Sequence, residues 1–354
     1  MLEDAAENDA AKGEALAERG WDCYDARDYA GAFCYFNRAI ARGSAKGING
    51  LARLYEEGNG VERNMKKALE LYHQAAARGY AGAQYNIGYY HEFLGDGQAD
   101  YEQAAHWYQQ AAEQGLPEAQ LRLGIFYHAG AGVAQDLSHA EILIRKAAEA
   151  GNAAAQFALG TLYHHGEGVP QDIDAAISWY TKSAEQNAQP AIAMLAQRYL
   201  GELFYLGEHI EKDHERAAAW FAKAARQRDK KAQFCLGCLY VWGEGVAMDY
   251  EQAAFWFKEA ARRGYAPAQS YLASLYYWGD GVEKDDNMAF KLTERAANYY
   301  PQAQSDMRWC YQLGIGVEQD DKTAAYWFGR AERLKYKNTP FPYQRLDFIL
   351  QEVK

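Results

Sequence analysis

This sequence contains little proline, no long apolar run and no excess of positive charge. Seven prolines among 354 residues disfavour proline-rich linkers, whereas 32 glycines indicate frequent punctuation of secondary structure. Ala-rich stretches such as 104–112 are interrupted by polar residues, so none reaches the roughly 18 to 20 apolar residues of a membrane-spanning helix. The net charge of −11 would repel phosphate backbones and anionic lipid. We therefore expect no nucleic-acid partner and no membrane insertion.

Cysteine is also sparse, and it follows no regular spacing. An odd, irregular count favours reduced thiols and a cytoplasmic location, and residues 1–11 lack the basic and apolar regions of a signal peptide. A periplasmic location stays open for a chain whose signal peptide has been removed. Cys235 and Cys238 have zinc-ligand spacing, but no second pair or histidine motif follows them, so zinc is disfavoured. A disulfide between Cys23 and Cys34 stays open. The five cysteines are Cys23, Cys34, Cys235, Cys238 and Cys310.

The sequence does contain a repeat with a period of 36 residues. Successive Ala-Gln dipeptides are spaced by 36, 36, 41, 36, 36 and 35 residues. A further copy without this dipeptide begins near Lys46, which gives eight copies in all. Five additional residues lie between copies four and five, and Pro190 is placed to begin a longer first helix there, at an irregular joint. The dipeptides begin at Ala83, Ala119, Ala155, Ala196, Ala232, Ala268 and Ala303.

Each copy predicts two helices joined by a Gly-x-Gly-Val turn, because the apolar residues on both sides of the turn have helical spacing. An aspartate after the turn, such as Asp249, is placed to cap the second helix, and a glycine such as Gly115 is placed to end it. A glycine in the first helix, such as Gly237, would let the two helices approach closely. We also expect a regular tryptophan column to pack in the core: Trp107, Trp179, Trp220, Trp256 and Trp327.

The pattern A-Q-x-x-L-G-x-L-Y-x-x-G-x-G-V, followed by D-x-x-x-A-x-x-W-Y/F-x-x-A-A, resembles the Sel-1-like repeat family. This family is a branch of the tetratricopeptide-like helical solenoids. The resemblance implies an all-α, right-handed α-α superhelix of about nine helix-turn-helix repeats. Copies two and five depart from the pattern in the turn, and copy three has Leu143-Ile144 in place of the aromatic pair.

The repeat also suggests domain boundaries. We expect a flexible N-terminus over residues 1–12, a capping repeat of the tetratricopeptide type over 13–44, and eight Sel-1-like repeats over 45–337. Residues 338–354 are expected to form a linker and a C-terminal helix that covers the last repeat. The apolar side chains of this tail also suit it to fold back into the groove of the solenoid.

We find no catalytic, cofactor-binding or metal-ligating constellation in the sequence. His128 and His164 stand one period apart and are more typical of a surface column than of a ligand set. The Gly-x-Gly-Val turns recur too often to be phosphate loops. We therefore expect no enzyme and no cofactor. The alternative is a hydrolase of the β-lactamase or penicillin-binding type, which cysteine-rich relatives resemble, but the chain lacks both their periodic cysteines and a Ser-x-x-Lys site.

Function should therefore lie on a surface that the repeats build together. Numbering each copy from its Ala-Gln as positions one and two, we expect positions three, seven, ten and eleven to point away from the core. By the resemblance this face lines a concave groove. Its side chains are unexpectedly apolar: Tyr85, Tyr89, Phe93, Phe157, His165, Tyr205, Phe234, Trp242, Tyr277, Trp278 and Trp309.

Two interpretations of these columns stay open. A tightly curled solenoid would bury them in itself. Alternatively they form an aromatic groove for a protein or peptide, because Trp and Tyr dominate binding hot spots. We favour the second: a non-catalytic scaffold or adaptor, expected to be a monomer or weak oligomer, with its partner site centred on Trp242 and Trp278. By the resemblance, bacterial roles include regulation and inhibition of secreted effectors, as in immunity proteins.

Overall fold

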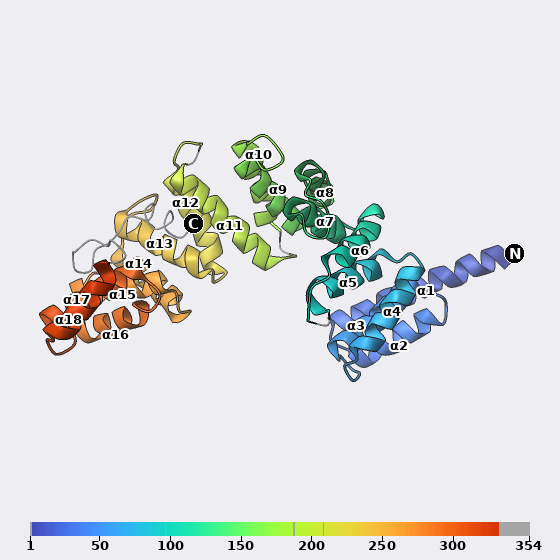
Figure 1. Cartoon of the computed structure of the whole chain (residues 1–354), viewed down its shortest axis with the longest axis horizontal. Coiled ribbons are helices and arrows are strands. Elements are labelled where there is room, and N and C mark those ends of the chain that lie inside the picture. The colour runs from blue at the N-terminus through green and yellow to red at the C-terminus, as the bar shows by residue number, and fades with distance from the viewer. Residues whose placement is uncertain (1, 96, 187, 208, 333–354) are drawn as a thin grey trace. The chain divides into compact units, whose positions relative to one another are not determined.

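In a computed structural model, the chain is described over residues 2–95, 97–186, 188–207 and 209–332, and this part contains helices but no strand. The all-α repeat architecture expected from the sequence is therefore confirmed (Figure 1). The chain divides into two compact units, residues 1–172 and 173–354. The division falls inside the fourth copy, between its first and second helices.

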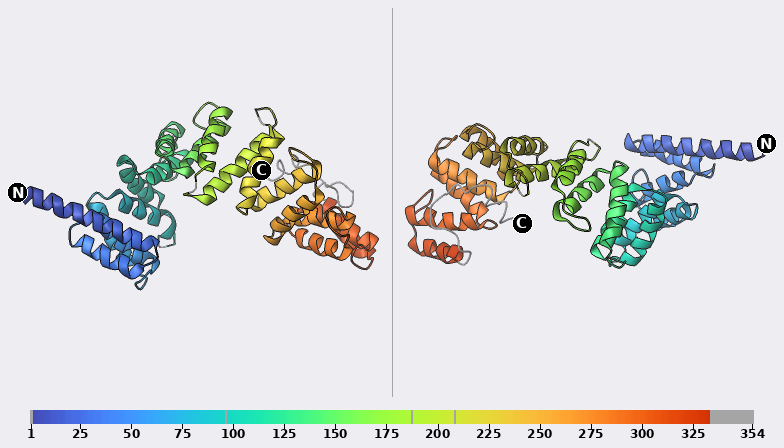
Figure 2. Two further views of the ribbon diagram at one scale, coloured as in Figure 1. Left: turned by 180° about the vertical axis from the view of Figure 1, so that it is seen from behind. Right: turned by 90° about the horizontal axis from the view of Figure 1, so that it is seen from above.

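Unit 1 contains the N-terminal helix pair, copies one to three and the first helix of copy four. Within the unit, each helix packs against the next one along the chain. Figures 1 and 2 show the first turns of α1 projecting beyond α2. The elements of unit 1 are α1 (Leu2–Asp25), α2 (Tyr29–Ile40), α3 (Ala45–Glu57), α4 (Met65–Ala77), α5 (Ala81–Tyr89), the π-helix η1 (Tyr90–Leu94), α6 (Tyr101–Glu113), α7 (Pro117–Ala129), α8 (Leu137–Glu149) and α9 (Ala153–His165).

Unit 2 contains the second helix of copy four and copies five to eight. Its helices also stack in chain order, each against its neighbours (Figure 2). Its elements are α10 (Ile173–Ala184), α11 (Pro190–Leu206), α12 (His214–Arg226), α13 (Lys230–Trp242), α14 (Tyr250–Arg262), α15 (Ala266–Trp278), α16 (Asp286–Ala296), α17 (Pro301–Leu313) and α18 (Asp321–Glu332).

Two irregular copies follow from local sequence. α11 has 17 residues and Pro190 in its first turn, as expected, whereas most first helices have 13. Copy two has Leu94 where other copies have the glycine that ends the first helix, so the left-handed cap cannot form there. The helix instead continues as η1 and ends at Gly95.

The helix ends are satisfied as the sequence predicts. The Asp249 carboxylate accepts a hydrogen bond from the Gln252 backbone N–H at 2.9 Å, and Asp136, Asp213 and Asp285 cap their helices in the same way. Gly245 shows why the turn needs a second glycine. Its φ is +70°, and a side chain there would collide with the His214 carbonyl of the preceding copy.

The Ala-Gln dipeptide joins successive copies. The Gln233 side-chain amide donates to the Ala225 carbonyl, near the end of the preceding second helix, at 3.1 Å. This bond satisfies one of the carbonyls that a helix end leaves without a partner. The glutamine is buried, so each copy fixes its register on the previous one through a shielded hydrogen bond. The same arrangement occurs in Gln120, Gln156, Gln197, Gln269 and Gln304.

The core column differs by one residue from the expected one. The five tryptophans of the predicted column are only half-buried, and the Lys223 ammonium lies 3.7 Å from the centre of the Trp220 ring. The next residue, Phe221, is fully buried. One step along a helix turns a side chain by about 100°, so only one of two adjacent aromatic residues can face the core. The buried column is Tyr72, Tyr108, Ile144, Tyr180, Phe221 and Phe257.

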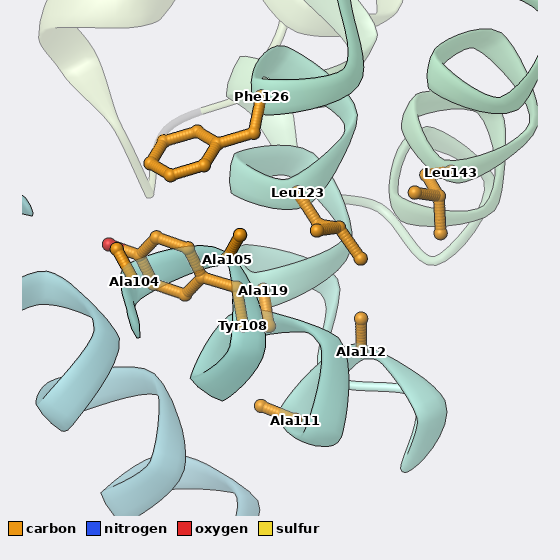
Figure 3. Close-up of a cluster of buried hydrophobic side chains, with 9 residues drawn as sticks. All are labelled: Ala104, Ala105, Tyr108, Ala111, Ala112, Ala119, Leu123, Phe126 and Leu143. Atoms are coloured by element: carbon orange, nitrogen blue, oxygen red, sulfur yellow. The ribbon is translucent and has the colours of Figure 1, made fainter. Parts of the chain in front are cut away.

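The buried column packs against the glycine of the first helix. A Cβ on Gly237 would lie 2.5 Å from the Phe257 ring, and a Cβ on Gly88 would lie 2.7 Å from Tyr108. The expected close approach of paired helices is therefore confirmed. Figure 3 shows this core in copies two and three, with the rings of Tyr108 and Phe126 beside small alanines of α6. The glycine makes room for the ring, and the ring fills that room.

The predicted domain boundaries remain predictions. α1 begins at Leu2, so residues 2–12, expected to be a flexible N-terminus, form the first part of that helix. The predicted linker and C-terminal helix, residues 338–354, lie outside the described residues. None of the described helices combines the length and the apolar character required to cross a bilayer.

Candidate functional site

The surface of interest lies on the first helices of the copies. Position six faces the second helix of its own copy, as the contact of Gly237 with Phe257 shows. At about 100° per residue, positions seven and eleven point together in a different direction, about 40° apart. We call the side presented by positions seven and eleven of the first helices the inner face.

Positions three and four lie beside the inner face and join the copies. The Phe234 ring, at position three, lies 5.1 Å from the ring of Tyr271, at position four of the next copy. Ser270 and Asp306 are paired in the same way, with the hydroxyl donating to the carboxylate at 3.4 Å. The expectation that position three points away from the core is therefore wrong for Phe234, which is 1% exposed. Contact with the next copy, not with its own second helix, buries it.

Position ten also joins the copies. The Tyr205 hydroxyl donates to the carboxylate of Glu244, in the turn of the next copy, at 2.6 Å. Its ring stacks on His214 with the centroids 4.9 Å apart, and it is buried. In unit 1, His128 also occupies position ten. Its Nε2 lies 2.8 Å from the carboxylate of Glu167, which is the turn residue equivalent to Glu244. The expectation that position ten points away from the core is therefore wrong for Tyr205, which is 1% exposed and joins adjacent copies.

The inner face of unit 1 is open. Tyr89 is half-buried at position seven, and its ring lies 4.7 Å from that of Phe93, which is 52% exposed at position eleven. Ile125, at position seven of the next copy, is 40% exposed. The Arg122 guanidinium lies 5.2 Å from the Phe93 ring and 3.4 Å from Glu92. Of the other predicted site residues here, Tyr85 and Phe157 are half-buried and His165 is exposed.

The inner face of unit 2 is closed at position seven in copies six and seven. Cys238 is fully buried there, and Ser274 is 2% exposed. Burial raises the pKa of the Cys238 thiol well above its ordinary value, so the thiol stays neutral and is no activated nucleophile. Polar residues beside the face are buried as well: Ser305 and Asp306 are each 1% exposed. The sequence pattern did not single out these small and polar residues.

Position eleven of unit 2 stays exposed. Trp242 is 39% exposed, Trp278 is 53% exposed and Leu313 is 54% exposed. The Tyr277 ring packs edge-on against Trp278 with the centroids 4.7 Å apart. Trp309, at position seven of the last copy, is half-buried with the Arg308 guanidinium 4.8 Å from its ring. The structure thus places Trp242 and Trp278 at equivalent exposed positions of adjacent copies, and their role in binding a partner stays a prediction.

Carboxylates surround this face in unit 2. Glu202 occupies position seven of copy five and pairs with Arg198 at 2.5 Å, and Arg198 also lies 3.7 Å from Asp229. Glu244 and Asp280 occupy the same turn position in successive copies. Asp306 accepts from the Gln302 amide at 3.0 Å. The face therefore combines exposed aromatic rings with carboxylates, one of which, Glu202, is paired with Arg198.

The described residues contain no group of three or more His, Cys, Asp or Glu arranged to hold a metal ion. Two open depressions of about 650 and 640 Å³ lie at the turns that precede α12 and α16. Charged residues of these turns, among them Glu211, Lys212 and Glu283, contribute to the lining of the two depressions. The five cysteines are free, including Cys23 and Cys34.

Comparisons with known proteins agree with this architecture. A Sel1 repeat protein from Oxalobacter formigenes superposes with a TM-score of 0.63 at 28% identity, over 90% of this chain and 89% of that one. A protective antigen of uropathogenic Escherichia coli with an SLR fold gives a TM-score of 0.56 at 28% identity, over 99% of this chain and 82% of that one. None of the curated proteins compared with the chain matches it.

The model of the Sel1 repeat matches eight times, and its first match begins at residue 45, where the sequence analysis placed the first copy. The matches cover residues 45–80, 81–116, 117–152, 153–187, 195–229, 230–265, 266–298 and 301–336. The gap between the fourth and fifth matches coincides with the additional residues before α11. The repeat, the helix pairs and these matches together show that the chain belongs to the Sel1 repeat family.

Proposed function

We propose that the protein is a non-catalytic adaptor whose unit 2 binds a basic, apolar-rich segment of a partner protein along its inner face. The observation that carries this proposal is the line of exposed apolar side chains at position eleven, Trp242, Trp278 and Leu313. Adjacent helices pack about 8 to 10 Å apart, and equivalent positions of successive copies repeat at a similar interval. One extended or helical segment can therefore contact all three.

The charge of the face defines the chemistry of the partner. Glu202, Glu244 and Asp280 accompany the aromatic rings, and the whole chain carries a net charge of −11. Lysine or arginine side chains would complement these carboxylates and would also stack on the exposed tryptophan rings. Inhibition of a secreted effector, as in immunity proteins, is one way in which an adaptor of this kind acts.

A hydrolytic function receives no comparable support. The buried thiols of Cys235 and Cys238 have raised pKa values, which disfavours the thiolate that nucleophilic attack needs. His214 stacks on Tyr205, one of the predicted site residues of unit 2. The apolar, regularly spaced surface is more typical of protein recognition than of catalysis.

The test is selection of peptides from a random displayed library on the full-length protein. We expect the selected peptides to be enriched in Lys, Arg and aromatic residues. Their affinity should fall about 30-fold, or roughly 2 kcal/mol, in a Trp242→Ala, Trp278→Ala double variant. The two rings are 39% and 53% exposed, so the melting temperature should change little.

The matched control is a Phe255→Ala, Tyr326→Ala double variant. These rings are 51% and 59% exposed and lie on second helices of unit 2, outside the inner face. The control should bind the selected peptides like the parent. Equal losses in both variants, or selected peptides with no basic or aromatic preference, would contradict the proposal.

A further inference from the structure

His214 holds the first position of α12, where most second helices have an apolar or aromatic side chain. Its imidazole ring stacks on the Tyr205 ring, with the centroids 4.9 Å apart and the ring planes 21° from parallel. The stack lies within copy five, between the end of α11 and the start of α12. A histidine here gives the copy a group that can change its charge near neutral pH. The equivalent residues of other copies include Met65, Tyr101, Leu137, Ile173 and Tyr250.

The stacked pair also holds copy five to copy six. Tyr205 is 1% exposed, and its hydroxyl donates to Glu244 in the turn of copy six at 2.6 Å. The same turn packs on the backbone of His214, because a Cβ on Gly245 would lie 2.0 Å from the His214 carbonyl oxygen. His214 covers one face of the Tyr205 ring, so movement of the imidazole would uncover a ring that joins the two copies.

The Nε2 atom of His214 is buried without a hydrogen-bond partner in the part of the chain that the structure describes. A neutral imidazole tolerates this position, because one of its nitrogens carries no hydrogen. An imidazolium carries a hydrogen on both nitrogens, and a buried charged donor without an acceptor is strongly unfavourable. The N-terminus of α12 opposes a positive charge as well, since it is the positive end of the helix dipole. The stacked position therefore suits the neutral ring only.

The open depression of about 650 Å³ before α12 lies beside this ring, and His214 is one of the residues that line it. The Arg216 guanidinium is held over the Phe204 ring at 3.8 Å, and its Nε lies 4.0 Å from the Asp213 carboxylate. Carboxylates outnumber cations in the lining, so a charged ring that turned outward would gain acceptors and contact with water. The charged residues of the lining are Asp174 from α10, Glu211, Lys212 and Asp213 from the turn, and Glu215 and Arg216 from α12.

We infer that His214 is a pH-sensitive clamp on the joint between copies five and six. The neutral ring stays stacked on Tyr205 and keeps the joint closed. When the ring takes up a proton, as histidine ordinarily does between about pH 7.5 and 5, it turns into the depression and leaves Tyr205 uncovered. The closed joint binds one proton fewer than the open joint, so a falling pH raises the open population.

The clamp concerns the joint and goes beyond the proposed function. Glu202 and Glu244 belong to the two copies that the joint connects. An open joint would therefore also alter the spacing of the carboxylates beside the inner face. Neither the contact between the two rings nor the opening of the joint requires a binding partner, so the clamp and the adaptor function are tested separately.

The first test observes the two rings by NMR in the full-length protein with labelled histidine and tyrosine. The His214 resonances are assigned by their absence from a His214→Phe variant. Nuclear Overhauser contacts between the rings of His214 and Tyr205 should be present at pH 7.5. They should disappear as the His214 resonances move to the positions of the protonated ring. Contacts that persist after His214 has gained its proton, or a ring that stays neutral at pH 5.0, would overturn the inference.

The second test measures hydrogen exchange in α11 and α12 at pH 7.5 and 5.0 by mass spectrometry. After correction for the chemical exchange rate at each pH, the parent should exchange about 10-fold faster at pH 5.0, which corresponds to one unit of proton linkage. His214→Phe keeps a ring to stack on Tyr205 but cannot take up a proton, so it should show no such acceleration.

The matched control for this test is a His165→Phe variant. His165 is an exposed histidine at the end of α9 in unit 1, and its removal should leave the acceleration in α11 and α12 intact. Carboxylates usually keep their charge down to about pH 5, so they should contribute little over this range. Equal acceleration in the parent and His214→Phe would assign the pH response to other groups and overturn the inference.

Discussion

The two units have the same helix pairs but differ on the face that these pairs present. At position seven, Tyr89, Ile125 and Thr161 of unit 1 are all partly exposed. In unit 2, Cys238 and Ser274 of copies six and seven are buried, whereas Glu202 and Trp309 are half-buried. The contacts behind the face are shared: the position-two glutamine donates to the preceding helix end in both units, in Gln120 as in Gln233. The repeat therefore determines how the helices pack on one another. The side chains at position seven vary independently of that packing.

This separation explains how one repeat supports different surfaces. The glutamine contacts the preceding copy, and the glycine packs against the buried ring within its own copy, so these positions are constrained by packing. Positions seven and eleven take no part in those contacts. Their side chains can change between copies without disturbing the stack, and a functional difference between the units belongs there.

The largest effect that we predict concerns the framework of unit 2. Phe257→Ala should lower the free energy of unfolding by about 3 to 5 kcal/mol, because it empties the space between α14 and Gly237. Hydrogen exchange should then accelerate first in α13 to α16, since each copy is supported only by its neighbours. Urea unfolding and exchange mass spectrometry of the full-length protein measure both effects.

The neighbouring tryptophan provides the control for that prediction. Trp256 is half-buried, so Trp256→Ala should cost clearly less than Phe257→Ala. Equal costs would mean that both rings of the aromatic pair form the core, contrary to the burial of Phe257 alone.

The next effect tests the contrast between the inner faces directly. Cys238→Asp should cost about 3 kcal/mol or more, because a carboxylate cannot be buried at a fully covered site without a partner. Ile125→Asp occupies the same position in unit 1 but stays in contact with water, and surface substitutions usually change stability by about 0.5 kcal/mol or less. Thermal unfolding of both variants at neutral pH gives the comparison, and similar melting temperatures would remove the distinction between an open and a closed face.

Much of the fold could be predicted from the sequence because the repeat multiplies weak local signals. A single glycine or aspartate predicts a helix end poorly. An aspartate at the equivalent place in several copies predicts an N-cap well, and the structure has these caps at Asp136, Asp213, Asp249 and Asp285. The additional residues at Pro190 and the longer α11 followed from a break in the same spacing. The family assignment rests on the same signal.

The details that escaped prediction depend on angles within a helix and on contacts between copies. Trp220 and Phe221 are adjacent, and the sequence analysis placed Trp220 in the core, whereas the structure buries Phe221. Phe234 was placed on the open side because only its own helix pair was considered, whereas the ring of Tyr271 in the next copy covers it. The burial of Cys238 and Ser274 was not predicted, because the sequence analysis selected aromatic residues and these side chains are small.

The smallest effect concerns pH and a difference within the buried column. That column has tyrosines at Tyr72, Tyr108 and Tyr180 but phenylalanines at Phe221 and Phe257. Burial, together with a hydrogen bond from its hydroxyl to Glu92 at 2.6 Å, holds the pKa of Tyr108 well above its ordinary value. The folded protein therefore keeps this phenol neutral at pH values where the unfolded chain, with a tyrosine pKa of about 10, releases the proton.

Tyr108→Phe should therefore reduce stability by about 1 kcal/mol at pH 7, where the hydrogen bond to Glu92 is lost but Glu92 keeps Arg122 nearby. The stability that the buried phenol contributes is complete below pH 10 and declines above it, by about 1.4 kcal/mol for each pH unit. The phenylalanine variant lacks this decline, so the difference from the parent should shrink as the pH rises and vanish near pH 11. Urea unfolding at pH 7, 9, 10 and 11 follows this difference, and a constant gap across the series would show that Tyr108 does not remain neutral in the folded protein.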